Sequence, residues 1–269
     1  MTRALVLGGG GPVGIAWESG LVAGLARLGV DLGAADRIVG TSAGSVVGAR
    51  LALRHEITAP ETPAAPDRAP AAEDTERGAS MATRMAGLME AMAAAASYKG
   101  SAEDARAILG KFALEQRTAP EESFVGWFAD LEGVSWPAAY GCTAVNARTG
   151  AFVLWNATAG VDLQRAVASS CSVPGIFPPI TIGADRYIDG GMRSPLNADV
   201  VVGADVVVAI SVMPTTTPGA VKPGELDTLR DAGATVEVID GDAAFIELTE
   251  GGVRLMDPAF GPPAYDLGL

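Results

Sequence analysis

A serine between two glycines is the first place in this chain where chemistry is expected. The stretch 40–44 reads G-T-S-A-G, with Ser42 at its centre, an apolar run before it and a helix-forming run, from 45 to about 53, after it. At a tight strand-to-helix turn the serine hydroxyl projects from the backbone, and glycine neighbours let other groups approach closely. The positive end of the following helix favours the anion that develops in acyl transfer. The stretch therefore predicts a nucleophile elbow with Ser42 as the nucleophile.

A histidine base is hard to reconcile with this serine. His55 is the only histidine of the chain, and it lies 13 residues after Ser42. If the helix continues that far, the two residues are about 20 Å apart at a rise of about 1.5 Å per residue. A Ser-His-Asp triad is nearly excluded by this count, so the base is expected to be a carboxylate, a lysine or a tyrosine.

Asp189 is the carboxylate best placed to act as that base. The run 186–188 predicts a short strand, Asp189 stands at its end, and Gly190 and Gly191 follow. Glycines there let a serine or another backbone segment approach the carboxylate closely. The same residues also fit an ordinary Asp-Gly turn, so by themselves they leave both interpretations open.

A glycine-rich loop at residues 8–14 is suited to form an oxyanion hole. Consecutive glycines permit conformations that aim several N–H groups at one point, next to the N-terminus of a helix predicted from 15 to 28. The loop also satisfies G-x-G-x-x-G after a strand, the fingerprint of dinucleotide-binding proteins, and Asp31 or Asp36 lies where a ribose-binding acid is expected. Against a nucleotide-dependent oxidoreductase stands the second turn at 40–44, which such a protein does not need.

Four blocks of this sequence together resemble the patatin-like phospholipases. They are the loop 9–14, the turn 40–44, the stretch 168–178 and the D-G-G at 189–191. In this order they are similar to the family's oxyanion loop, nucleophile elbow, A-S-x-x-x-P-x-x-F-x-P block and D-G-A/G motif. The resemblance extends from residue 4 to about residue 211.

The resemblance implies a serine hydrolase that works without a catalytic histidine. Ser42 would attack an ester carbonyl, Asp189 would be the general base, and N–H groups of Gly9, Gly10 and Gly11 would hold the oxyanion. A lipid or other acyl ester would be the substrate, with neither metal nor cofactor. The other motif glycines are Gly14, Gly40, Gly44, Gly190 and Gly191.

The charge of the chain limits its partners. With 19 basic and 32 acidic residues, the formal net charge is −13, which disfavours nucleic acid and electrostatic capture by an anionic membrane. The family often has arginine before the last glycine of the loop, where this chain has Val13. Both observations favour a carboxylic ester hydrolase that meets micelles or membrane surfaces transiently through apolar contact.

Strands and helices alternate along the chain and predict one α/β domain over 1–269. Apolar runs predict strands at 3–7, 36–39, 139–145, 151–155, 186–189, 206–212 and 236–239, and helical spacing predicts helices at 15–28, 162–170 and 226–232. This order is typical of a three-layer α/β/α fold with a mainly parallel sheet. The Pro- and Gly-rich end from residue 257 predicts a tail.

Residues 54–130 are expected to form an insertion over the site. Pro, Ala, Glu and Asp dominate 58–78, which predicts a flexible linker. Helices are predicted from 80 to 98 and from 101 onward, and the first of these carries a stripe of Met81, Met85, Leu88, Met89 and Met92. The stripe fits either a helix that packs on the core or an adaptable lid over an acyl chain.

The remaining features point to an ordinary intracellular protein. Cys142 and Cys171 form no Cys-x-x-Cys or Cys/His cluster, so neither a disulfide framework nor a zinc site is expected. The apolar runs are too short for a signal peptide or a membrane span, which predicts a cytoplasmic location. A catalytically silent binding protein of the same fold stays an alternative, and the oligomeric state is left open.

Overall fold

One mixed sheet of eight strands organises the computed structural model, which describes residues 1–58 and 80–269. The strand order is β5-β6-β3-β2-β1-β7-β8, with β4 paired to β3 outside this path. Neighbours from β3 to β8 in this order are parallel, and β4, β5 and β6 add antiparallel pairs. The strands are β1 (Arg3–Leu7), β2 (Arg37–Gly40), β3 (Tyr140–Asn146), β4 (Phe152–Asn156), β5 (Ile180–Ile182), β6 (Asp185–Asp189), β7 (Val206–Ser211) and β8 (Thr235–Asp240). The predicted mainly parallel sheet is confirmed.

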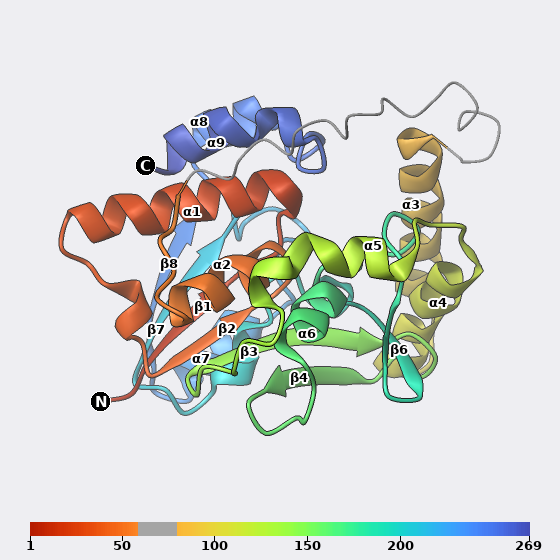
Figure 1. Ribbon diagram of the computed structural model, residues 1–269, viewed down its shortest axis with the longest axis horizontal. Helices are drawn as coiled ribbons and strands as arrows, with labels where there is room; N and C mark the ends of the chain where they lie inside the picture. The colour runs from red at the N-terminus through yellow and green to blue at the C-terminus, as the bar shows by residue number, and fades with distance from the viewer. Residues whose placement is uncertain (59–79) are drawn as a thin grey trace.

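Helices lie against this sheet (Figure 1). The α-helices are α1 (Gly11–Arg27), α2 (Ala43–Ala52), α3 (Met81–Ser97), α4 (Ala102–Glu115), α5 (Glu121–Val125), α6 (Leu163–Ser170), α7 (Glu225–Asp231), α8 (Ala243–Leu248) and α9 (Gly261–Gly268). Short 3-10 turns are η1 (Leu32–Ala34), η3 (Gly126–Leu131), η4 (Gly190–Met192), η5 (Ala198–Val201) and η6 (Pro258–Phe260). The linker predicted at 58–78 lies outside the described residues, except for Thr58.

The side chains of β1 alternate between two cores, as the period of a strand requires. Leu5 and Leu7 join the cluster that also contains residues of α1, α2 and α9. Ala4 and Val6 point to the other face and join a cluster with Leu229 of α7. Since both faces of β1 are covered, the sheet is the middle layer of the predicted α/β/α fold.

The α3–α4 pair covers the β3 and β6 side of the sheet through small and aliphatic residues. Ser80 and Ser101 cap the two helices by accepting N–H groups of the first turn. The inner side of α3 carries Leu88 and Ala91, whereas the stripe methionines Met81, Met89 and Met92 are 51%, 59% and 42% exposed. The interpretation of the whole stripe as core packing is therefore wrong.

The end of the chain is a packed helix, and the prediction of a tail from residue 257 is wrong. Proline has no N–H group, and N–H groups in the first turn of a helix have no intrahelical acceptor, so the prolines in the first turn of α9 are compatible with a helix start. Helix α9 packs on α1, where a Cβ added to Gly20 would overlap the carbonyl oxygen of Tyr265. Sequence composition does not reveal such a contact, because it depends on a flat, glycine-lined face elsewhere in the chain.

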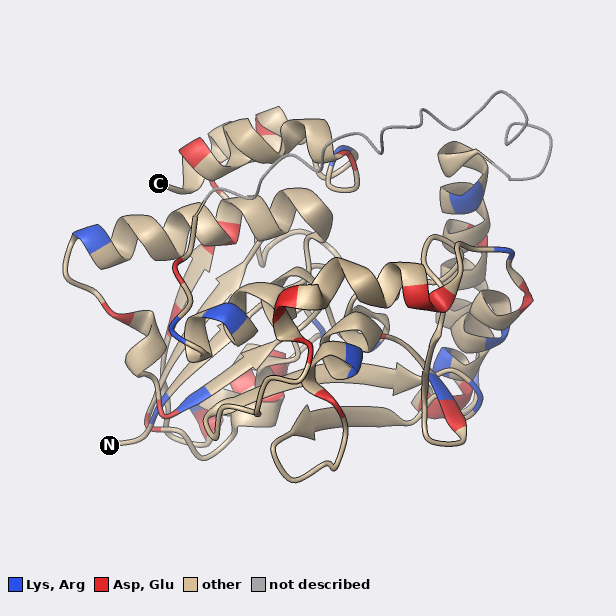
Figure 2. Cartoon of the chain, in the orientation of Figure 1, with Lys and Arg blue, Asp and Glu red and all other residues tan. Residues whose placement is uncertain are grey.

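Acidic side chains are interspersed with basic ones along the helices and loops of the described chain (Figure 2). Among the described residues, the structure has no helix with the length and apolar character needed to cross a bilayer.

Candidate active site

Strand register brings Ser42 and Asp189 to the same level of the sheet. Gly40, at the end of β2, pairs with Cys142 of β3. Two residues further along β3, Ala144 pairs with Asp189 at the end of β6. Because Ser42 lies two residues beyond Gly40, it reaches the height of Asp189 on the other side of β3.

The turn that carries Ser42 has the strained backbone of a nucleophile elbow. Ser42 has φ 52° and ψ −116°, a conformation that residues with a Cβ rarely adopt. A Cβ on Gly40 would overlap the carbonyl oxygen of Gly44, and a Cβ on Gly44 would overlap that of Leu7. The two glycines are therefore required by close packing of β1, the turn and α2, and this packing holds the serine at the tip.

The tripeptide 170–172, which begins with the last residue of α6, holds the backbones of both residues. The Ser42 N–H donates to Ser170 Oγ at 3.0 Å. The Asp189 N–H donates to the Ser172 carbonyl oxygen at 3.0 Å. Between them, Cys171 Sγ lies 3.3 Å from the Ser42 carbonyl oxygen. The block 168–178 thus positions the serine and the aspartate together.

The carboxyl group of Asp189 is buried, and burial dominates its pKa. Asp189 is 2% exposed and Ser42 is 8% exposed. Burial raises the pKa of Asp189 to about 7, while hydrogen bonds from the Gly191 N–H and the Ser42 hydroxyl act in the opposite direction. The Gly191 N–H lies 2.7 Å from Asp189 Oδ1 and fixes the orientation of the carboxyl group. A base with this pKa is half ionised near neutral pH, which suits general base catalysis.

The glycine loop has free donors, but Gly9 is not one of them. The Gly9 N–H donates to the Pro195 carbonyl oxygen at 2.8 Å, so the expectation that it holds an oxyanion needs correction. Gly9 instead gives room: a Cβ there would be 3.4 Å from Ser42 Cβ. The N–H groups of Gly10 and Gly11 donate to no acceptor among the described residues, which leaves both available for a ligand.

A third free donor, which the sequence analysis did not name, is the N–H of Ala43. It is the first residue of α2, and its N–H has no acceptor in the described part of the chain. The residue after the nucleophile of an elbow often serves as an oxyanion donor, so its position was a usable signal. The starts of α1 and α2 therefore meet around Ser42, each with unpaired N–H groups.

The other motif glycines permit close contacts around the site. The Gly14 N–H donates to the Gly10 carbonyl oxygen at 2.8 Å, which closes the loop onto α1. A Cβ on Gly190 would overlap Thr143 Oγ1, so glycine lets the chain after Asp189 lie against β3.

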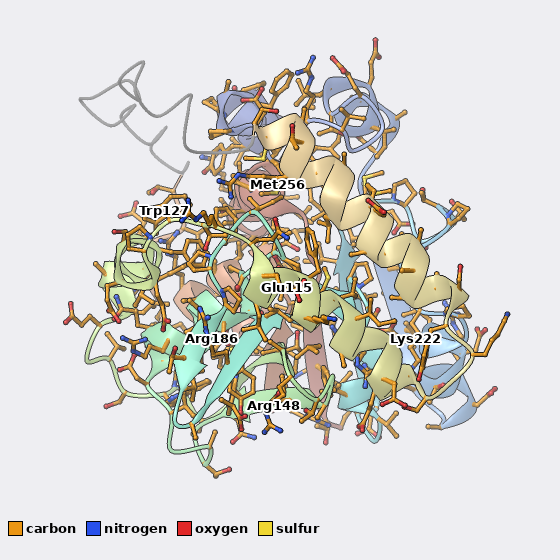
Figure 3. All side chains as sticks on the ribbon, turned by 90° about the vertical axis from the view of Figure 1, so that its right-hand side faces the viewer. Glu115, Trp127, Arg148, Arg186, Lys222 and Met256 are labelled. Atoms are coloured by element: carbon orange, nitrogen blue, oxygen red, sulfur yellow. The ribbon has the colours of Figure 1, made fainter. Side chains whose placement is uncertain are left out.

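Residues from elements far apart in sequence lie beside the glycine loop and the loop after Ser172. The sulfur of Met256, labelled in Figure 3, lies beside Gly11, only 2.8 Å from the position of an added Cβ. Arg84 of α3 donates to the Gly175 carbonyl oxygen at 3.1 Å, which ties α3 to the loop after Ser172. Trp127 is 65% exposed and packs edge-on against Phe177 of the same loop.

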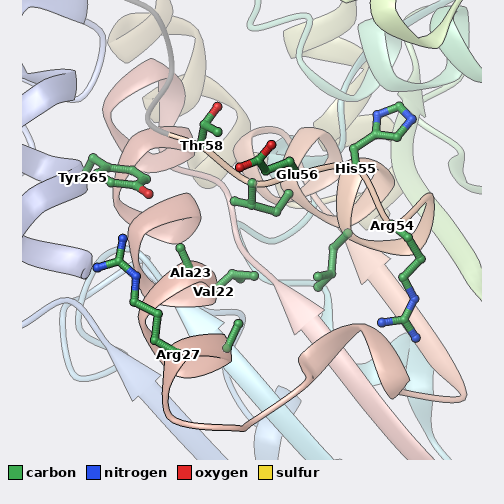
Figure 4. A pocket seen from close by; sticks show the side chains of 11 residues that line it. Val22, Ala23, Arg27, Arg54, His55, Glu56, Thr58 and Tyr265 are labelled. Atoms are coloured by element: carbon green, nitrogen blue, oxygen red, sulfur yellow. The ribbon is translucent and has the colours of Figure 1, made fainter.

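His55 lies in a separate hollow of about 490 Å³ (Figure 4). Its lining comes mainly from α1, the end of α2 and the residues after it, with Tyr265 of α9; neither Ser42 nor Asp189 belongs to it. The single histidine is thus part of a different surface from the Ser42–Asp189 pair.

The residues proposed for a dinucleotide are engaged elsewhere. Asp31 pairs with Arg54 at 2.8 Å. Asp36 accepts the Arg3 N–H at 2.8 Å. It precedes the first residue of β2, so it lies at the opposite end of the parallel strands from the glycine loop, which follows the last residue of β1. A ribose-binding acid belongs at the end of β2, where Ser42 follows instead, so the interpretation as a nucleotide-binding oxidoreductase is unsupported.

The cysteines are small buried residues near the site. Cys142 and Cys171 are free, and burial raises the pKa of the Cys142 thiol to about 12 and that of Cys171 further. Among the described residues no group of three or more His, Cys, Asp or Glu side chains is placed to hold a metal ion.

Comparisons with known proteins identify the family of this chain. A model of the family described as patatin-like phospholipase matches residues 5–202. Among solved structures, VipD from Legionella pneumophila is similar over 98% of this chain and 67% of its own, with 13% identity and a TM-score of 0.46. The type III effector protein ExoU is similar over 100% of this chain and 54% of its own, with 17% identity and a TM-score of 0.36. This chain thus spans about half the length of the ExoU chain, and no curated protein matches it.

Proposed function

This chain belongs to the patatin-like phospholipase family, and from that premise we propose that it hydrolyses carboxylic esters of lipids with Ser42 as nucleophile and Asp189 as general base. The observation that carries the proposal is the buried Asp189 carboxyl, whose pKa burial raises to about 7 against the opposing influence of the Gly191 N–H and the Ser42 side chain. A carboxylate of this pKa beside the serine can act as its general base without a histidine.

In the acylation half of the reaction, Ser42 Oγ forms a bond to the ester carbonyl carbon and its proton passes to Asp189. The tetrahedral intermediate collapses as the carbon–oxygen bond to the alcohol breaks, and Asp189 returns the proton to the leaving oxygen. In the second half, water gives a proton to Asp189 and attacks the acyl-serine. The fatty acid leaves, and Ser42 regains its proton.

Backbone N–H groups stabilise the negative charge on the carbonyl oxygen. Gly10, Gly11 and Ala43 have free N–H groups at the starts of α1 and α2, the two helices that flank Ser42. Such preorganised donors favour the charge that develops in the transition state over the neutral ester.

The substrate is an acyl ester whose headgroup need not be recognised by charge. Val13 is fully buried, and its N–H donates to the Leu255 carbonyl oxygen, so this position offers the headgroup no cation. Met256 beside the glycine loop, and Phe177 and Trp127 in and beside the loop after Ser172, would supply apolar surface for an acyl chain and for transient contact with a micelle. Of the insertion predicted at 54–130, within the single domain, the described helices α3 and α4 would cover the acyl chain.

A fluorophosphonate probe, which modifies activated serines, tests this function. The wild-type chain should be labelled and should hydrolyse short p-nitrophenyl esters. Ser42→Ala should lose both properties, and Asp189→Asn should lose turnover by at least about 100-fold. His55→Gln is the matched control and should keep full activity. Equal labelling of the wild type and Ser42→Ala would refute the assignment of the nucleophile.

A further inference from the structure

A buried amide links the backbone beside both proposed catalytic residues. The side chain of Asn197 is fully buried. Its Nδ2 donates to the Ser194 carbonyl oxygen at 2.6 Å and is also within hydrogen-bond distance of Thr41 Oγ1 and of the Gly190 carbonyl oxygen, each at 3.1 Å. Thr41 immediately precedes Ser42, and Gly190 immediately follows Asp189. A single side chain therefore bridges the two segments that carry the reacting groups.

The orientation of this amide is fixed from its other end. Asn197 Oδ1 accepts a hydrogen bond from Arg193 Nη1 at 2.8 Å. Arg193 is itself held by two hydrogen bonds to Asp199, at 2.8 and 2.6 Å, and Lys222 pairs with the same carboxylate. Because a guanidinium group has no acceptor, the oxygen of the amide must face Arg193, and the NH₂ group must face the site.

The middle strand joins the same network. Thr143 of β3 lies between the strands that lead to the two residues, and its Oγ1 is 2.8 Å from Thr41 Oγ1. Gly190 is in contact with the same Thr143 hydroxyl. Asn197 has φ 56° and ψ 34°, a left-handed conformation that asparagine tolerates better than most residues. Backbone conformation and side-chain bonding thus both favour asparagine at this position.

We propose that Asn197 is a positioning residue that sets the separation between the Ser42 hydroxyl and the Asp189 carboxyl. This inference rests on the proposed ester hydrolysis. Asn197 bonds to the residues next to Ser42 and Asp189 and not to these two residues themselves, so it acts on the reaction only through geometry. A misplacement of about 1 Å lowers the rate of a reaction by about 100-fold, and it does so in kcat, because the binding surface for the acyl chain is unchanged.

Three substitutions separate positioning from folding. Asn197→Ala removes both donors and should lower kcat and the rate of fluorophosphonate labelling by about 10- to 100-fold, with KM within about threefold. Thr41→Val keeps the shape and removes one acceptor, and it should give a smaller loss. In the double variant the two losses should not multiply, because both remove the same link.

Asn197→Asp adds a readout that a merely structural residue would not move. One carboxylate oxygen can keep the bond to Arg193, but the other would face the carbonyl oxygen of Gly190. The new negative charge close to Asp189 should shift the acid limb of kcat/KM to higher pH. Asn146→Ala is the matched control, because Asn146 is also buried but accepts only N–H groups of its own turn, from Arg148 and Thr149.

The experiment compares labelling rate, kcat, KM and melting temperature across these variants and the wild type. Asn146→Ala should lose thermal stability and keep kcat, whereas the Asn197 variants should lose kcat at temperatures well below their melting transition. If Asn197→Ala and Thr41→Val label at wild-type rates, the positioning role is refuted while the proposed function stands. A wild type that neither labels nor hydrolyses esters refutes the proposed function, and the positioning role with it.

Discussion

Ester hydrolysis should be lost as the pH falls below neutrality, because the proposed base, Asp189, becomes protonated in that range. The pKa of Asp189 rises from 3.8 to about 7, chiefly by burial. At pH 5 only about 1% of such a carboxyl group is ionised, so kcat/KM should be about 100-fold below its plateau. A carboxyl with an ordinary pKa would be more than about 90% ionised at the same pH and would leave kcat/KM almost unchanged.

The same shift predicts how the stability of the protein depends on pH. An acid whose pKa is raised by folding stabilises the folded state while it is protonated, and this contribution is lost as pH rises from about 4 through 7. The rise corresponds to about 4 kcal/mol. Asp189→Asn keeps an oxygen for the Gly191 N–H and stays neutral. The variant should therefore be more stable than the wild type at pH 8, by up to about 4 kcal/mol, and no more stable at pH 4.

The assay is ester hydrolysis between pH 4 and 9, with the released acid quantified by chromatography because nitrophenol absorbance itself depends on pH. His55→Gln is the essential control, because histidine is the other residue type whose charge commonly changes near neutral pH. The fall of kcat/KM near pH 7 should persist in His55→Gln. Chemical denaturation at several pH values should show that Asp189→Asn is more stable than the wild type at pH 8 and no more stable at pH 4. A wild-type kcat/KM that falls only near pH 4, or a fall near pH 7 that disappears in His55→Gln, would refute the reasoning.

Three further predictions concern buried or exposed positions. Glu18 is fully buried, and burial raises its pKa well above 4.5 against a smaller opposing effect of the Gly8 backbone N–H; Glu18→Gln should therefore become more stable than the wild type as the pH rises above about 5, by up to about 1.4 kcal/mol per pH unit until the folded-state pKa is reached, measured by urea denaturation. Gly44→Ala would push a methyl group into the Leu7 carbonyl and should destabilise the fold by several kcal/mol, whereas Gly126→Ala, with open space around it, should leave the melting temperature unchanged. Met89→Gln, on the exposed side of α3, should slow long-chain esters more than short-chain ones, and equal losses would contradict a lid role.

Seven of the eight strands were predictable because their signals are local, whereas β5 (Ile180–Ile182), which follows a Pro-rich loop, was not predicted. Most of the buried strands are short apolar runs. Glycines on both sides of Ser42 indicate the elbow. The C-terminal helix was missed because its stability comes from contact with the glycine face of α1, and proline and glycine in its sequence suggest a tail instead. In this segment, tertiary packing outweighs the local preference that the composition indicates.

The candidate site was only partly predictable for the same reason. Ser42 and Asp189 could be proposed because motif residues surround them, but their common level depends on register across β3. Which glycine N–H groups are free could not be read from G-G-G, because the Gly9 N–H is taken by Pro195, far along the chain. Asn197 carries no local signal at all, since its role follows from hydrogen bonds to residues on two other segments.

The most direct test of the account is the identity of the acyl-enzyme. Protein quenched in acid during turnover of a short-chain ester should carry the acyl group on the peptide that contains Ser42, as seen by mass spectrometry. Asp189→Asn should form this adduct far more slowly, and Ser42→Ala should form none. Steady turnover with the acyl group on another residue, or undiminished turnover by Ser42→Ala, would contradict the proposed mechanism.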